Sequence, residues 1–354
     1  MLTLIFNGYI VTFSLGKSPT TMTTAPPSFP EQVVALLLSY WQSKALGAVA
    51  EMGVADLLAD GPLSIDELAR RTNSNPSALF RTLRALESIG IFTQVSPRVF
   101  ANSKSSELMR KDAPGSQRHV LLAHFCHGYT FNEAWEGISD VIKTGKSSFD
   151  LKYGFDLWEH CRRKPEVGVN FNETVRTFGD SSMESVANAY DWTQFPVIAD
   201  IGGGTGKQLM TILDKAPNSS GILFDQPHLS KEVMTHARME FVPGNFFQKI
   251  PSGADLYMLR WIIHDWPWAQ KKQILQCIRK AMKPGARLIL VETLIPDGPE
   301  FSLSKWLDLE VMAAVNGDEL TEAEYRTLFE ECGFRLNQVI STPTPLNLLV
   351  ASLQ

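Results

Sequence analysis

Short apolar runs alternate with amphipathic segments over the second half of the chain. Residues 269–282 place apolar side chains on one side of a helix, and Thr321–Glu324 begins a further helix that Gly333 ends. Runs rich in Ile, Leu and Val predict strands at 197–201, 221–225, 255–261, 286–292 and 346–350. Strands that alternate with helices form a parallel sheet with helices on both faces. We therefore expect a doubly wound α/β domain over residues 191–354.

The pattern before residue 105 predicts a smaller, mainly helical domain over residues 30–105. Residues 33–58 read as a helix that is apolar around most of its circumference, which must be buried in a subunit interface or in a core. Ser64–Glu67 has the capping-box pattern, and a second helix follows Asn75 and Pro76. Two short β-rich runs then suggest a hairpin. Two helices followed by a hairpin are typical of a winged helix.

A winged helix has two common uses. In a DNA-binding protein, residues near Ser77–Arg84 would enter the major groove, with Arg81 and Arg84 available for contacts. The alternative is a module for dimerisation that also closes a neighbouring pocket. Two arginines on an acidic chain favour the alternative.

The remaining segments flank these domains. Residues 106–190 are helical in pattern and rich in aromatic residues, so we expect a connector that lines an apolar pocket, although core packing explains most of these aromatics one by one. Residues 1–29 are expected to be a disordered tail, in which Met22 is an alternative start. The apolar residues 2–13 lack a basic leader and a cleavage site, and no apolar run reaches the ~20 residues of a membrane span.

Composition narrows the function classes. The chain has 354 residues and a net charge of −5, so two domains are expected and a polyanionic partner such as nucleic acid is disfavoured. The four cysteines are too scattered for a disulfide framework or a zinc site, which suits a cytoplasmic location. No cluster of ligands has metal-binding spacing, so no metal is expected.

A glycine-rich turn points to a cofactor. Residues 200–206 read Asp-Ile-Gly-Gly-Gly-Thr-Gly between a predicted strand and helix, and Asp225 ends the next strand at a spacing suited to ribose hydroxyls. The dinucleotide pattern G-x-G-x-x-G fails, because its third glycine would fall on Lys207 or Leu209. The pattern instead resembles the cofactor loop of S-adenosylmethionine methyltransferases.

Two candidate catalytic groups follow neighbouring strands. His264 lies just past the run 255–263, and Glu292 ends the next strand. Ligands of open α/β sheets bind outside the carboxyl ends of strands, so both residues should converge with Asp200 and Asp225. A neutral imidazole is a suitable base near neutral pH, and a carboxylate on its far nitrogen would orient it. Glu292 is one candidate for that carboxylate. An isolated histidine at a strand end is more often structural, but sharing an edge with a cofactor loop favours catalysis.

From about Glu31 onward, the chain resembles the plant, fungal and bacterial small-molecule O-methyltransferases. Besides the glycine turn, the resemblance rests on residues 244–247 (Gly-Asn-Phe-Phe), residues 259–266 (Leu-Arg-Trp-Ile-Ile-His-Asp-Trp) and residues 316–324. It implies a winged-helix dimerisation domain before a Rossmann-like catalytic domain, with S-adenosylmethionine as cofactor and a homodimer as the assembly. It also implies that His264 is the general base, that Asp265 shapes the site, and that Glu292 and Glu319 bracket the imidazole. Without the resemblance, Glu319 reads as a solvated residue before a helix cap.

The same resemblance assigns the cofactor site. Gly202 and Gly204 would lie against the aminocarboxylate end, and Asp225 would bind the ribose. Phe246 would lie against the adenine, and Arg260 takes the place of the usual lysine near the ligand. Asn245 replaces the usual aspartate, which removes a charge from the adenine contact. The segment after Asp225 is short for the family and leaves room only for a clipped helix at about 231–239.

The sequence therefore predicts an O-methyltransferase that acts on a hydroxyl, phenolic or enolic, of a small apolar metabolite. The expected lining of the substrate pocket is His124, His127, Trp135, Phe171, Asn172 and Met312. Two other functions stay open. A relative with non-methylating chemistry, such as a pericyclase or hydroxylase, would not need His264 with two flanking carboxylates. A ligand-sensing DNA-binding regulator would bind duplexes in a salt-dependent way.

Overall fold

The computed structural model describes residues 2–6, 9–13, 28–180 and 182–354. The chain divides into two compact units. The first unit comprises the residues up to 132 together with 169–177, and the second comprises 133–168 and 178–354. The segment 106–190, predicted as a separate connector, is thus shared between the two units.

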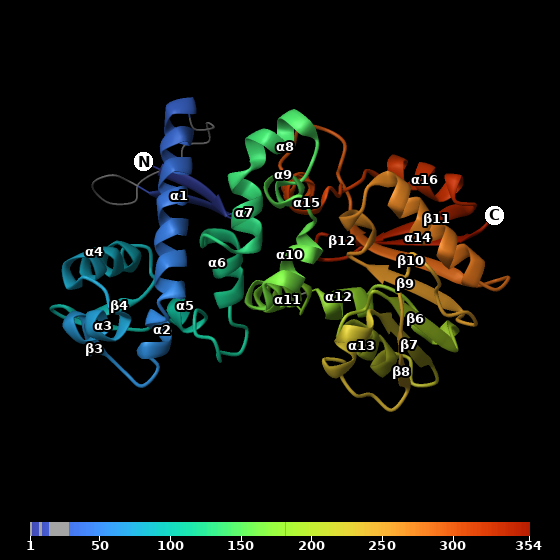
Figure 1. The fold of residues 1–354 in the computed structure, drawn as a ribbon, viewed down its shortest axis with the longest axis horizontal. Helices are drawn as coiled ribbons and strands as arrows, with labels where there is room; N and C mark the ends of the chain where they lie inside the picture. Colours follow the sequence, from blue (N-terminus) through green and yellow to red (C-terminus); the bar gives the residue numbers. More distant parts are fainter. Residues whose placement is uncertain (1, 7–8, 14–27, 181) are drawn as a thin grey trace. The chain divides into compact units, whose positions relative to one another are not determined.

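The first unit contains the expected winged-helix arrangement, in which a three-stranded sheet of order β3-β5-β4 accompanies the helices (Figure 1). Its elements are β1 (Leu2–Phe6), β2 (Tyr9–Phe13), α1 (Phe29–Glu51), α2 (Val54–Leu57), β3 (Leu63–Ser64), α3 (Ile65–Thr72), α4 (Pro76–Glu87), β4 (Thr93–Ser96), β5 (Val99–Ala101), α5 (Lys104–Glu107) and α6 (Arg118–Phe125). α7 (Thr130–Glu136) and α11 (Pro165–Asp180) each contribute residues to both units.

Local sequence explains where these helices begin. Asn75 caps α4, because its Oδ1 accepts from the backbone N–H groups of Ser77 and Ala78 at 3.0 Å each. Ser64 caps α3 through a 3.2 Å bond from the Glu67 N–H. The predicted capping box is only half formed, because the Glu67 carboxylate binds Arg70 and Arg71 on the next turn instead of the Ser64 N–H.

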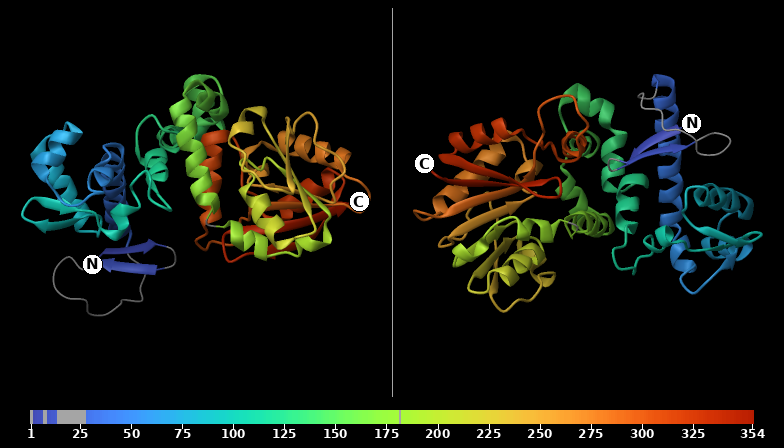
Figure 2. Two further views of the ribbon diagram at one scale, coloured as in Figure 1. Left: turned by 90° about the horizontal axis from the view of Figure 1, so that it is seen from below. Right: turned by 180° about the vertical axis from the view of Figure 1, so that it is seen from behind.

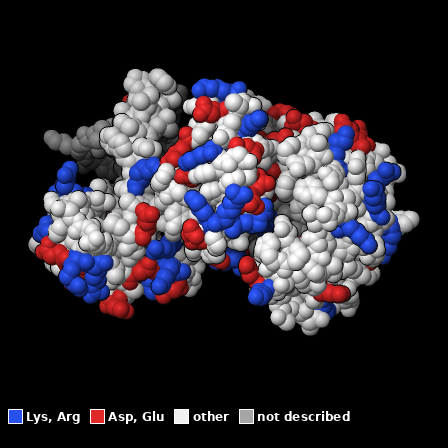
Figure 3. All heavy atoms as spheres, viewed as in Figure 1, with Lys and Arg blue, Asp and Glu red and all other residues white. Residues whose placement is uncertain are grey.

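Helix α1 is less buried than its apolar pattern predicts. Within this helix only Gly47, Val49 and Ala50 are buried, whereas Leu36 is 70% and Tyr40 60% exposed. The exposed end of the helix presents largely uncharged atoms (Figure 3). By length and composition α1 is apolar enough to cross a membrane, contrary to the expectation that no segment is. Exposed apolar side chains of this kind are typical of a surface that packs against a partner.

Residues 2–6 and 9–13 form two paired strands where a disordered tail was expected. β1 and β2 pair antiparallel, with Leu2 opposite Phe13 and Phe6 opposite Tyr9. The expectation of disorder was wrong for these two strands. Residues 14–27, which include Met22, lie outside the described part of the chain.

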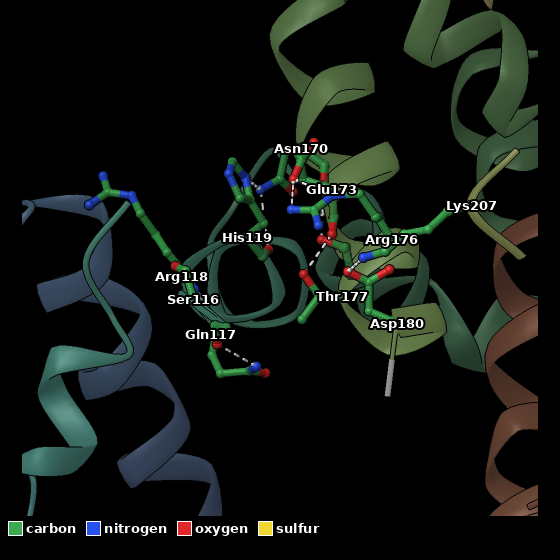
Figure 4. A network of polar contacts seen from close by, with 12 residues as sticks. Ser116, Gln117, Arg118, His119, Asn170, Glu173, Arg176, Thr177, Asp180 and Lys207 are labelled. Atoms are coloured by element: carbon green, nitrogen blue, oxygen red, sulfur yellow. Dashed lines mark hydrogen bonds and ion pairs between the residues drawn. The ribbon is translucent and has the colours of Figure 1, made fainter. Parts of the chain in front are cut away.

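Two polar contacts stabilise the α6 and α11 part of the first unit (Figure 4). The Asn170 amide nitrogen lies 3.1 Å from His119 Nδ1 and donates to the His119 carbonyl oxygen at 3.2 Å. One turn along α11, the Arg176 guanidinium binds the Glu173 carboxylate. The Asn170 contacts join the start of α6 to α11, whereas the Arg176–Glu173 pair lies within α11.

The second unit is a seven-stranded sheet of order β11-β12-β10-β9-β6-β7-β8, in which β12 runs antiparallel to its neighbours (Figures 1 and 2). Its strands are β6 (Val197–Ile201), β7 (Ser220–Asp225), β8 (Met239–Pro243), β9 (Leu256–Arg260), β10 (Arg287–Thr293), β11 (Phe334–Ser341) and β12 (Leu346–Leu353). β8 and β11 were not predicted. The helix expected at 231–239 was wrong: residues 232–238 form a loop that leads into β8.

Helices cover both faces of this sheet. The helices of the second unit are α8 (Ile138–Thr144), α9 (Ser148–Tyr153), α10 (Leu157–Arg163), α12 (Met183–Asn188), η1 (Trp192–Gln194), α13 (Lys207–Lys215), η2 (Pro227–Lys231), η3 (Ile263–Asp265), α14 (Trp268–Ala281), α15 (Leu303–Val315) and α16 (Glu322–Glu331). α14 and α16 share one apolar core with the sheet, and α12 and α13 share the other. The doubly wound prediction is confirmed.

The strand order reverses beside β6. β7 and β8 lie on one side of β6, whereas β9 and β10 lie on the other. The helices that follow β6 and β9 lie on opposite faces of the sheet, and ligands of open α/β sheets bind outside the carboxyl ends of the strands at such a point. The glycine turn follows β6, and His264 follows β9.

Candidate active site

The glycine turn after β6 has the backbone geometry that the sequence predicts. Gly202, Gly204 and Gly206 have φ values of 76°, 59° and 85°, in the left-handed region that favours glycine. A Cβ atom at Gly202 would lie 2.5 Å from Ile262 Cδ1 and 3.8 Å from Phe246 Cε1. The torsion therefore favours glycine at position 202, and a Cβ there would displace the end of the Ile262 side chain.

Asp225 is held against this turn. Its Oδ2 accepts from the Gly204 N–H at 2.8 Å, and its Oδ1 accepts from the Gln226 N–H at 2.6 Å. Burial raises the pKa of Asp225, against the effect of these two donors. A carboxylate accepts about four hydrogen bonds, so Asp225 keeps acceptor capacity for hydroxyl groups of a ligand.

Asp200 is buried at the end of β6, within the electrostatic influence of Arg260. Asp200 is 1% exposed, and within the described chain its Oδ2 has no hydrogen-bond partner. Burial raises its pKa to about 7, against the attraction of Arg260. Arg260 donates to the Gly179 carbonyl oxygen at 2.8 Å and to Ser182 Oγ at 2.7 Å. The guanidinium thereby joins the end of β9 to the segment before α12.

Asn245 and Phe246 lie on the loop after β8. Asn245 Oδ1 accepts from the Phe247 N–H at 2.9 Å, so the side-chain amide still caps this turn. The Phe246 ring meets Phe247 edge-on at 4.8 Å and Trp266 at 6.0 Å between centroids. Together with its approach to Gly202, this packing gives Phe246 a defined place beside the glycine turn.

The imidazole of His264 is oriented by Glu319. His264 lies on η3, and its Nδ1 is 2.8 Å from Glu319 Oε1. Its other ring nitrogen, Nε2, is 3.3 Å from Asp265 Oδ1. Both ring nitrogens thus face a carboxylate. The shorter contact, to Glu319, favours the proton on Nδ1 in the neutral ring, which leaves Nε2 as the nitrogen that takes the second proton.

Glu319 is not the solvated residue that the sequence alone favours. Its side chain is 0% exposed, and its Oε2 accepts from Thr293 Oγ1. Its N–H donates to Asp308 Oδ1 at 3.0 Å. Glu319 is therefore a buried and well-oriented acceptor for the imidazole.

Glu292 was one candidate for the carboxylate that orients the imidazole, but the structure gives it backbone partners instead. Its Oε1 accepts from the N–H groups of Ile262 and Ile263, at 3.2 Å and 2.9 Å. The carboxylate thus anchors the backbone that leads to His264, after Trp261 has turned the chain with φ of 52°. Burial raises the pKa of Glu292 to about 7, partly offset by His264. Glu292 lies near the imidazole, but its hydrogen bonds go to the backbone.

The site is electrostatically unusual. Burial disfavours the imidazolium, but Asp265, Glu319 and Glu292 favour it more and raise the pKa of His264 to about 10. Ligand atoms of His264, Glu292 and Glu319 lie within 4.8 Å of one another, which is close enough for a metal ion. The absence of a metal stays a prediction from the sequence.

Three positions near His264 were given no role from the sequence. Thr293 binds Glu319, and Asn316 binds both the Asp150 carboxylate and the Ser147 N–H at the start of α9. A Cβ at Gly317 would clash with the His264 carbonyl oxygen. The motif Asn316-Gly317 was noted for its resemblance, but only the folded chain shows what each residue contacts.

The six candidate pocket residues fall into two groups. In the first unit, His124 stacks on Phe131 at 4.6 Å, and Phe131 lies 5.8 Å from Phe171. Asn172 and His127 belong to that unit as well. In the second unit, Trp135 donates to Glu310 of α15 at 3.4 Å, and the same helix carries Met312. That the two groups line one pocket stays a prediction.

Comparison with known proteins decides the family. Residues 135–335 match the model of the O-methyltransferase domain, and residues 34–112 match that of the O-methyltransferase dimerisation domain. The chain belongs to the O-methyltransferase family. It is 34% identical over 323 residues to phenazine O-methyltransferase PhzM of Lysobacter antibioticus, with 89% of this chain and 94% of the relative covered.

Solved structures agree with this assignment. The crystal structure of LaPhzM has a TM-score of 0.87 at 32% identity and covers 93% of this chain and 100% of its own. CalO1, a methyltransferase in calicheamicin biosynthesis solved in its SAH-bound form, has a TM-score of 0.75 at 28% identity over 93% and 100% of the two chains. The protein is an O-methyltransferase that depends on S-adenosylmethionine, as predicted, and its dimerisation domain supports a homodimer.

Proposed function

We propose that this O-methyltransferase methylates a phenolic or enolic hydroxyl of a small apolar metabolite, with His264 as the general base. The observation that carries the proposal is the 2.8 Å bond between His264 Nδ1 and Glu319 Oε1. This bond orients the ring and leaves Nε2 to take the proton of the acceptor hydroxyl.

The residues after β6, β7 and β8 fit the cofactor. Gly202 permits close approach of a ligand, Asp225 keeps acceptor capacity for ribose hydroxyls, and Phe246 offers an aromatic face near the turn. When bound there, S-adenosylmethionine supplies a methyl group on a positively charged sulfur. The site residues would bind and align it.

The carboxylates around His264 would support proton transfer. Asp265 and Glu319 flank the two ring nitrogens and stabilise the imidazolium that forms when Nε2 accepts a proton. With its pKa near 10, His264 starts protonated in the ligand-free protein at neutral pH. A cationic ligand beside the cluster disfavours the imidazolium and lowers that pKa, which prepares the ring to act as base.

Aromatic surroundings and relatives support the substrate class. The stacked His124 and Phe131 rings, with Phe171 nearby, present flat apolar surfaces in the first unit. One relative acts on a phenazine, an aromatic compound, as its name states. A phenol has a pKa near 10, so a positioned imidazole can remove its proton during transfer.

The assembly and the location follow from other features. The exposed apolar side chains of α1, including Leu36, Tyr40 and Trp41, would be covered by a second copy through the dimerisation domain. All four cysteines are free, which supports a reducing, cytoplasmic setting.

Labelled S-adenosylmethionine and a panel of phenols test the proposal, with His264→Gln compared to wild type. Loss of turnover in His264→Gln with unchanged cofactor binding is the expected result. His236→Gln is the matched control, because His236 lies beside Asp214, away from the described base. Undiminished turnover in His264→Gln would refute the base, and cofactor binding without any methylation would favour the non-methylating alternative.

A further inference from the structure

Lys271 is a fully buried lysine that contacts the residue before His264, the proposed base. It lies in the first turn of α14, and its side chain is 0% exposed. A buried ammonium is costly unless its donors are satisfied. Lys271 Nζ donates to the Ile263 carbonyl oxygen and to the Asp318 carbonyl oxygen, both at 3.0 Å, and it forms an ion pair with Asp318 Oδ1 at 2.5 Å.

The partners of Lys271 are the residues that immediately precede the two members of the catalytic pair. Ile263 precedes His264 on η3, and Asp318 precedes Glu319. The same two segments are joined a second time, because the Asp318 N–H donates to the His264 carbonyl oxygen at 3.0 Å. Lys271 therefore connects the backbone of the base to the backbone of the carboxylate that orients it.

We propose that Lys271 is a positioning residue, which sets the distance and angle between His264 and Glu319. The inference rests on the proposed role of His264. Lys271 acts through the two backbone carbonyls and contributes a positive charge to a cluster of three carboxylates. That charge lowers the pKa of Asp265 and Glu292. Misplacing a reacting group by about 1 Å can lower the rate about 100-fold, so loss of the two Lys271 hydrogen bonds should lower turnover.

The next residue provides a matched control. Lys272 lies on the same helix, but its side chain is 35% exposed and pairs with Glu331 at 2.9 Å. We expect Lys271→Met to lower kcat roughly 10- to 100-fold, with the cofactor Kd within about twofold of wild type. Lys272→Met should leave both constants unchanged.

Loss of the Lys271 charge should also shift the acid limb of the kcat–pH profile to higher pH, because His264 and the neighbouring carboxylates then retain protons more strongly.

A double variant separates charge from position. Lys271→Met with Asp318→Asn removes both charges of the ion pair, so the net charge beside His264 stays as in wild type. Its pH profile should return toward wild type, whereas kcat should stay low because the two carbonyl ties are still absent. The double variant also serves if Lys271→Met alone does not fold, as judged by circular dichroism.

Clear outcomes overturn the inference. If folded Lys271→Met, or the folded double variant in its place, turns over within twofold of wild type, Lys271 has no positioning role. A failure of the proposed function would show differently, because wild type would then be inactive or His264→Gln would retain full turnover.

Discussion

Glu319, and not Glu292, is the hydrogen-bond partner of His264: its Oε1 lies 2.8 Å from Nδ1 of the imidazole. Glu292 instead accepts from two backbone N–H groups at the start of η3. Two buried carboxylates near one imidazole thus divide the work, because one orients the ring and the other holds the backbone that carries it.

This division predicts the effect of Glu319→Gln. An amide at position 319 no longer selects the Nδ1–H tautomer by charge, and it can present a donor to Nδ1 instead of an acceptor. We expect kcat to fall about 100- to 1,000-fold while cofactor binding is retained, as steady-state kinetics and calorimetry would show. Glu322→Gln, which only loses an exposed pair with Arg326, is the control. A kcat within threefold of wild type would contradict the assigned role.

Glu319→Gln should also change the pH dependence of kcat, in a direction that the structure predicts. Glu319 raises the pKa of His264 by its charge and its hydrogen bond. Below its pKa the imidazole is protonated and accepts no proton, so activity rises as pH increases through that pKa. Removal of the Glu319 charge should move the acid limb of kcat to lower pH. A limb that stays in place or moves upward would show that another group controls it.

Gly202→Ala should impair cofactor binding more than folding. The new Cβ would lie 2.5 Å from Ile262 Cδ1, at a φ of 76°. Gly285→Ala is the matched control, because its φ of 84° is also left-handed but no atom lies within 4 Å of a Cβ there. Both changes should lower the free energy of unfolding by about 1–2 kcal/mol, but only Gly202→Ala should raise the cofactor Kd, about tenfold or more. Equal Kd values for the two variants would mean that the turn does not face the cofactor.

Asn245→Asp should strengthen cofactor binding. The carboxylate would still accept from the Phe247 N–H, as Asn245 Oδ1 does at 2.9 Å, and it would restore the charge that the family usually has there. Hydrogen bonds to a charged acceptor are stronger, by about 1 kcal/mol, so we expect the Kd to fall about fivefold in calorimetry. Gln248→Glu places the same charge on an exposed neighbour and should change little. Weaker binding in Asn245→Asp would place the adenine elsewhere.

The sequence predicts the scaffold of this site well and its contacts less well. The left-handed turn at Gly202 and the convergence of His264 with Glu292 follow from glycine spacing and strand ends, which are local signals. The roles of Glu292 and Glu319 do not, because they depend on which backbone groups face each carboxylate after folding. Lys271 shows the same limit: its helical spacing matches an inward position, but a lysine there reads as exposed until its three oxygen partners are seen.

The Asn316 side chain ties the start of α9 to the segment that ends in Glu319. Residues 147–150 belong to the helical stretch expected to shape the acceptor pocket. We therefore expect changes in that stretch, made to redirect the enzyme to new acceptors, to disturb the alignment of the proposed base as well. A redesign of the substrate range should keep Ser147 and Asp150 and alter the side chains around them.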